Sequence, residues 1–79
     1  MPSEKEDIQE FLTAFGKRVK ELRKERGMTQ VELEAKSGLD VRQIQRIEAG
    51  DVNFTIETLL RLAKGFIIDL AKLLELNDL

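Results

Sequence analysis

Apolar residues recur at helical spacing in five stretches of the chain. The stretches span residues 3–26, 29–37, 40–48, 55–65 and 69–76. The first is the longest, and its apolar face consists of Ile8, Phe11, Leu12, Phe15, Val19 and Leu22. The strict alternation of apolar and polar residues that marks a half-buried strand is missing from the sequence. The pattern therefore predicts an all-α protein, a compact bundle of five helices with an extended first helix.

Polar residues that can cap a helix stand at the start of each stretch. The capping side chains are Ser3, Thr29, Asp40, Thr55 and Asp69. Three of them have a capping-box partner three residues later, at Glu6, Glu32 and Gln43. Four of them also lie between apolar residues spaced as hydrophobic staples: Met28 with Leu33, Leu39 with Ile44, Phe54 with Leu59, and Ile68 with Leu73. Four staples in one chain favour an array of short helices with fixed crossing angles.

Glycines divide the pattern further. Gly27, Gly38 and Gly65 are expected to end helices, because glycine accepts the positive φ of a helix C-terminus. Gly16 interrupts the first helix and is expected to mark a kink or a junction. The predicted organisation is an N-terminal helical extension, residues 1–16, followed by one domain, residues 17–79.

Composition excludes several classes of function. A chain of 79 residues without cysteine or histidine cannot form disulfides, zinc fingers or histidine-dependent catalytic sites. It also lacks a nucleophile–base pair, so we expect neither an enzyme nor a cofactor or metal site. The polar N-terminus is unlike a signal peptide, and no apolar run reaches transmembrane length. These features predict a cytoplasmic protein with no membrane partner.

The net charge of −2 is unevenly distributed along the chain. Residues 17–64 carry a net charge of +3, whereas residues 1–16 carry −3 and residues 65–79 carry −2. The positive charge therefore lies in the segment that contains the predicted short helices at residues 29–37, 40–48 and 55–65. It is modest, so binding to a polyanion through this segment should weaken readily as salt is added.

Residues 29–50 read as two short helices joined by a tight turn, and the second helix has two distinct faces. At 100° per residue, Ile44 and Ile47 share one side, and Arg42 and Arg46 lie opposite them. Arginine binds the O6 and N7 atoms of guanine, and glutamine binds the N6 and N7 atoms of adenine. This arrangement predicts a helix-turn-helix, with its core at residues 29–50, that binds double-stranded DNA.

Several motifs in order resemble one known family. They read RVKELRKERGMTQ, VELEAKSGLD, RQIQRIEAG, TIETLLRLAKG and IDLAKLL, and they extend from Lys17 to Leu74. The chain resembles the Cro/phage-repressor type of helix-turn-helix protein, the XRE family, whose fold is the lambda-repressor-like DNA-binding bundle. Small members of that family act as homodimers on palindromic operators. They include controllers of restriction–modification genes, antitoxins and prophage repressors.

The resemblance implies a role for individual residues. Residues expected over the major groove, in contact with bases, are Val41, Arg42, Gln43 and Arg46. Residues expected to contact phosphates are Gln30, Gln45 and Asn53. Arg23 and Glu48 match an ion pair that ties the first helix to the recognition helix. The chain departs from the family in having Glu34 where a small residue is usual, and in lacking a basic residue in the loop that contains Asn53.

Eight apolar residues crowd the C-terminal 14 residues, more than a short terminal helix can readily bury. The predicted dimer interface consists of Phe66, Leu70, Leu73 and Leu76. Core packing alone is the competing interpretation of these residues. For the polar residues assigned to bases, phosphates or the ion pair, the competing interpretation is that they are ordinary solvent-exposed side chains without a partner. At the level of function, the alternative to a DNA-binding regulator is a protein-interaction module, an antitoxin or adaptor with the same fold.

Overall fold

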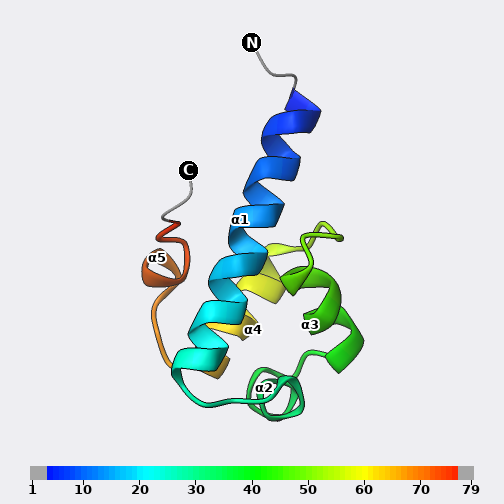
Figure 1. Cartoon of the computed structure of the whole chain (residues 1–79). Helices are drawn as coiled ribbons and strands as arrows, with labels where there is room; N and C mark the ends of the chain where they lie inside the picture. Colours follow the sequence, from blue (N-terminus) through cyan, green and yellow to red (C-terminus); the bar gives the residue numbers. More distant parts are fainter. Residues whose placement is uncertain (1–3, 77–79) are drawn as a thin grey trace.

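A computed structural model describes residues 4–76, with side chains from residue 7 onward, and contains five helices and no strand within that range (Figure 1). The helices are α1 (Glu4–Glu25), α2 (Gln30–Ser37), α3 (Val41–Glu48), α4 (Ile56–Phe66) and α5 (Leu70–Leu73). The predicted all-α fold is therefore confirmed. The predicted cap Ser3 lies outside the described residues. No helix of the described chain is long and apolar enough to cross a membrane.

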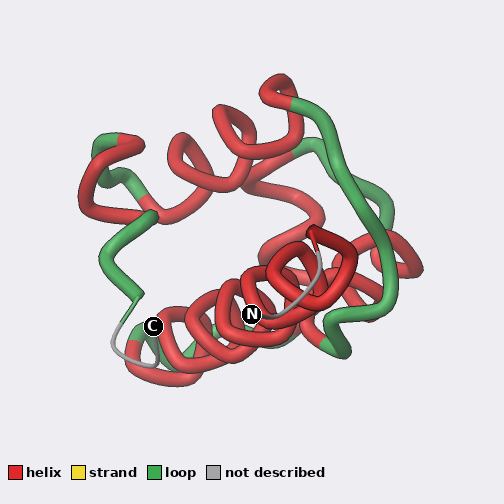
Figure 2. Tube along the Cα trace, turned by 90° about the horizontal axis from the view of Figure 1, so that it is seen from above, coloured by secondary structure: helices red, strands yellow, loops and turns green. Residues whose placement is uncertain are grey.

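The helices pack in pairs around one core. In Figure 1, α1 runs along the front of the molecule, with α3 on one flank, α5 on the other and α4 behind. α1 packs on α3, α2 packs on both α3 and α4, and α5 packs on α4. Seen from above, α1 and α4 form opposite sides of the bundle (Figure 2). The largest fully buried side chains are Phe15, Val19, Leu33, Ile44, Ile47, Leu62 and Leu73.

The predicted caps of α2 to α5 are present. Thr29 completes a capping box, since its hydroxyl accepts from Glu32 N–H and the Glu32 carboxylate accepts from Thr29 N–H. Thr55 and Asp69 cap α4 and α5 in the predicted way, each accepting a hydrogen bond from the third helical residue. Asp40 instead accepts from Arg42 N–H. All eight staple residues belong to the core or pack against it.

Two glycines allow helices to approach closely, a role that the sequence analysis did not assign to them. α1 continues through Gly16, where an added Cβ would overlap the carbonyl oxygen of Ile47 and lie 2.8 Å from that of Glu48. α4 continues through Gly65, where an added Cβ would lie 3.0 Å from Cβ of Ser37. The helix end expected at Gly65 is therefore absent, and α1 is not interrupted at Gly16.

The boundary predicted after residue 16 is not visible in the packing of the described residues. Phe15 is fully buried in the core, and its ring lies 4.9 Å from that of Phe54. Leu12 and Ala14 are also buried. The second half of the proposed extension is thus an integral part of the domain, while Ile8, one turn before Leu12, is half exposed.

The C-terminal apolar residues are divided between core and surface. Phe66 and Leu73 are buried within the single chain, so the prediction that they line a subunit interface was wrong. α5 is only four residues long; it packs on α4, and Arg18 of α1 donates a hydrogen bond to the carbonyl oxygen of Lys72. Leu70 and Leu76 are partly buried. Ile67 is 85% exposed and ends α4 in the left-handed region, with φ of 57°.

Candidate nucleic-acid interface

α3 is fixed to the bundle by its inner face and presents polar side chains outward. Ile44 and Ile47 are fully buried beneath it. Arg42, Gln45 and Arg46 are exposed on the other side. Of the other residues predicted to contact bases, Val41 and Gln43 are partly buried, and the amide nitrogen of Gln43 donates to the hydroxyl of Thr58 on α4. The capping box predicted for Gln43 is therefore absent.

The C-terminal end of α3 is joined to α1 by an ion pair. Arg23 donates from Nε to Oε2 of Glu48 at 2.7 Å and from Nη2 to Oε1 at 3.0 Å. The side chains of Arg23 and Glu48 are 12% and 5% exposed. Arg23 also donates from Nη1 to the carbonyl oxygen of Met28. The hydrogen bond that Arg23 donates to Glu48 raises the pKa of Arg23, although partial burial opposes the rise.

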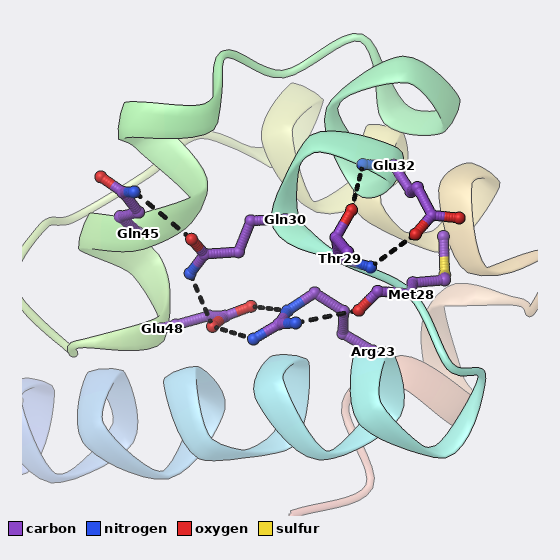
Figure 3. A network of polar contacts seen from close by, with 7 residues as sticks. All are labelled: Arg23, Met28, Thr29, Gln30, Glu32, Gln45 and Glu48. Carbon is purple, nitrogen blue, oxygen red and sulfur yellow. Dashed lines mark hydrogen bonds and ion pairs between the residues drawn. The ribbon is translucent and has the colours of Figure 1, made fainter.

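A chain of amide hydrogen bonds extends this ion pair to the exposed face of α3 (Figure 3). Gln30, the first residue of α2, donates from Nε2 to Oε1 of Glu48 at 3.1 Å. Gln45 in turn donates from Nε2 to Oε1 of Gln30 at 3.3 Å. Gln30 and Gln45, both expected from the sequence to contact phosphates, thus contact each other as well.

Two carboxylates occupy the N-terminus of α3. Glu34 accepts a hydrogen bond from Val41 N–H at 2.8 Å, and Asp40 accepts one from Arg42 N–H at 2.8 Å. The first two free N–H groups of the helix are thus engaged, and two negative charges offset the positive end of its dipole. An external anion would have to compete with these two carboxylates for this end of the helix.

The loop between α3 and α4 is anchored at both ends. Gly50 has a φ of 70°, and its carbonyl oxygen accepts a hydrogen bond from the side chain of Gln9 on α1. Phe54 packs against Phe15. Asn53 is exposed, and its Oδ1 accepts a hydrogen bond from Phe54 N–H, which leaves its Nδ2 facing solvent. No group of acidic side chains in the described part of the chain is arranged to hold a metal ion.

Comparison with known proteins agrees with this geometry. The helix-turn-helix family matches residues 19–73, which include all of α2, α3 and α4. The chain belongs to the XRE-type helix-turn-helix family. As a helix-turn-helix protein it is a member of a family of DNA-binding transcription regulators.

This helix-turn-helix protein is similar to solved structures of restriction-modification controller proteins. It is 35% identical to C.AhdI from Aeromonas hydrophila, with a TM-score of 0.76 over 78% of this chain and 94% of that chain. It is 34% identical to wild-type C.Esp1396I, with a TM-score of 0.73 over 81% of this chain and 87% of that chain. A further match is the C.Esp1396I tetramer in complex with its natural 35 base-pair operator, with 34% identity, a TM-score of 0.71, and coverage of 81% and 93%. No curated protein sequence matches significantly.

Within this helix-turn-helix, Glu34 reaches from α2 to the start of the next helix. It stands seven residues before Val41, whose backbone N–H donates to its Oε2 at 2.8 Å. The contact exists because the turn at Gly38, with φ of 78°, folds α3 back beside α2. The residue that departs from the family pattern thus caps the recognition helix.

Proposed function

We propose that this protein is a sequence-specific transcriptional regulator that binds a palindromic operator as a homodimer. The observation that supports this function best is the rigid mounting of α3, whose inner face is fully buried while Arg42 and Arg46 are exposed. A recognition helix must be held still to discriminate between bases, because a small displacement breaks the geometry of bidentate hydrogen bonds. A regulator of this kind works in the cytoplasm, where its operator lies.

In this proposal the outward side chains of α3 make different contacts with the DNA. Arg42 and Arg46 bind guanine through their planar guanidinium groups, and Gln43 and Val41 contact bases near the start of the helix. Val41 has only an apolar surface to offer, which suits the methyl group of thymine. Gln30, through its remaining amide hydrogen, and Asn53, through Nδ2, contact phosphates and set the position of the protein along the groove.

The homodimer is supported by the relatives and by the surface around the C-terminus of α4. The C.Esp1396I relative binds its operator as a tetramer. In this chain the exposed residues Ile56, Leu60 and Ile67 are spaced to form one stripe along α4. Glu57 and Lys64 lie beside this stripe, near its opposite ends.

A second copy packed across this stripe by two-fold symmetry would place Glu57 of each subunit against Lys64 of the other. The stripe leads through Ile67 to Leu70 and Leu76, the two residues of the predicted interface set that are not fully buried. The proposed dimer therefore retains Leu70 and Leu76 and excludes Phe66 and Leu73.

The proposal is tested by measuring the affinity of the protein for a selected operator and for random DNA at several salt concentrations. Arg42→Ala and Arg46→Ala should each weaken binding to a selected operator by about 1–3 kcal/mol and reduce the preference for it over random DNA. Lys36→Ala is the matched control, because it removes the same charge from the exposed last turn of α2. If Arg42→Ala and Arg46→Ala bind DNA no more weakly than Lys36→Ala, the helix-turn-helix is not used on DNA, and a protein partner becomes the better account.

A further inference from the structure

The orientation of the Gln30 side-chain amide is set by the charge of its neighbour. Glu48, bound to the Arg23 guanidinium through both carboxylate oxygens, can only accept hydrogen bonds. Gln30 must therefore turn its Nε2, and not its Oε1, toward Glu48, as observed at 3.1 Å. The reversed amide would place an oxygen against the carboxylate.

The same constraint passes on to Gln45. With Nε2 of Gln30 on Glu48, Oε1 of Gln30 faces α3 and can only accept. Gln45 must donate its own Nε2 to that oxygen, as it does at 3.3 Å. Figure 3 shows the Gln45 amide held in this way at the edge of the network. Its Oε1 accepts no hydrogen bond from any described residue, and its side chain is exposed.

We propose that Gln45 reads a base, adenine or cytosine, and that Gln30 is the positioning residue that fixes the Gln45 amide for this purpose. The inference rests on the proposed DNA-binding function and deepens it. The outward oxygen of this amide can be satisfied only by a hydrogen-bond donor, which the amino group of a base supplies. A phosphate offers only acceptors and could use no more than the second hydrogen on Nε2, leaving the oxygen unpaired. The proposal therefore assigns Gln45 to the base contacts, whereas the sequence led us to expect a phosphate contact.

The exocyclic amino group is the feature that adenine and cytosine share in the major groove. Adenine offers its N6 amino group, and cytosine its N4 amino group, to an acceptor such as Oε1 of Gln45. Adenine also has an acceptor at N7, for which the second hydrogen on Nε2 of Gln45 remains available. Guanine presents two acceptors there and thymine an acceptor and a methyl group, so the donor in each base pair comes from the adenine or cytosine opposite them.

Selection of bound sequences from a random DNA pool tests the proposal when the wild type is compared with two variants. Gln45→Ala should abolish the preference for one base pair at one position of each half-site, a change of about tenfold in relative affinity. Gln30→Met keeps the size of the side chain but removes the hydrogen bond to Gln45, and should relax the preference at that same position. Gln9→Met is the control, because Gln9 also bridges two segments with its amide but lies on α1 and outside this network.

Adenine and cytosine are distinguished by replacing the selected base with 7-deazaadenine, which lacks the N7 acceptor. If adenine is selected, this replacement should weaken binding by the wild type but not by Gln45→Ala. If cytosine is selected, the contact is through its N4 amino group alone. Both results support an outward acceptor on Gln45. The proposal is overturned if the wild type binds equally well after the amino group is removed, with purine in place of the selected adenine or 2-pyrimidinone in place of the selected cytosine.

The side-chain NH2 resonances of Gln30 and Gln45 provide a readout that does not depend on DNA. In the free protein the Gln45 NH2 group should be ordered, and Gln30→Met should make it mobile while the fold is unchanged. If Gln30→Met instead weakens all DNA sites equally and leaves every base preference intact, Gln30 is only a phosphate contact and the proposal fails. Failure of the DNA-binding function itself is distinct, because Arg42→Ala and Arg46→Ala would then have no effect either.

Discussion

The guanidinium group of Arg23 binds the carboxylate of Glu48 in two places, with Nε to Oε2 at 2.7 Å and Nη2 to Oε1 at 3.0 Å. This contact joins the last turns of α1 and α3. It does more than hold two helices together, because the carboxylate also sets the orientation of Gln30 and, through it, of Gln45. Stability and the proposed reading of a base therefore depend on one nearly buried charge.

Glu48→Gln should destabilise the protein strongly. The substitution leaves Arg23 almost buried without its counter-ion, which costs about 3 kcal/mol when burial is nearly complete. Denaturant unfolding measures the change. Glu25→Gln removes an exposed carboxylate from the last turn of α1 and serves as the control, with an effect near the experimental error. Equal effects of the two substitutions would show that the Arg23–Glu48 pair is solvated in solution.

Gly16→Ala should destabilise the protein although alanine favours helices. The propensity gain is about 1 kcal/mol, whereas forcing a methyl group against the backbone of α3 costs about 3 kcal/mol. The obstacle is the carbonyl groups of Ile47 and Glu48, which cannot move without disturbing the ion pair. Thermal unfolding should show a lower Tm. An unchanged or higher Tm would mean that α1 and α3 are further apart than described.

Glu32 gives the stability of α2 a dependence on pH. Hydrogen bonds from Thr29 lower the pKa of Glu32 below its ordinary value of 4.5. A lowered folded-state pKa contributes stability that is present above the unfolded-state value and is lost as the pH falls through the folded-state value. Glu32→Gln retains a capping-box side chain without this titration.

The unfolding free energies of the wild type and Glu32→Gln should therefore converge as the pH is lowered from 6 toward 3. A difference that stays constant over this interval would contradict the role of the Glu32 carboxylate. The Arg23–Glu48 pair adds no such dependence through Arg23, since the raised pKa of the guanidinium lies far above this range.

Ile67→Asn should separate self-association from folding. Isoleucine in the left-handed region carries a steric cost of about 1–2 kcal/mol, which asparagine tolerates better. The variant should therefore unfold at the same or a higher temperature when dilute, yet sediment as a monomer at concentrations where the wild type is dimeric. A fully dimeric Ile67→Asn variant would remove Ile67 from the interface.

Local signals in the sequence predicted the helices well. The caps Thr29, Asp40, Thr55 and Asp69 are each satisfied within their own first turn, so neighbouring residues are enough to identify them. The burial of Ile44 and Ile47 followed from helical periodicity alone. The pairing expected for Arg23 and Glu48 came from the family resemblance, because 25 residues separate the two.

Contacts between elements were where prediction from the sequence failed. Gly16 and Gly65 looked like helix breakers because sequence alone does not show which backbone passes close by. Phe66 and Leu73 looked surplus because the depth of the core between α1 and α4 could not be foreseen. The hydrogen bond between Gln30 and Gln45 likewise depends on the crossing of α2 and α3.

The most direct test of the central claim is selection of bound sequences by the wild-type protein from a random pool of double-stranded DNA. If α3 reads DNA from a two-fold dimer, the enriched sequences should contain two inverted half-sites whose centres are about 34 Å apart, one turn of DNA. Arg42→Ala and Arg46→Ala should each erase the preference at symmetric positions in both half-sites. Enrichment of no sequence, or of one without inverted symmetry that both variants also select, would contradict the account.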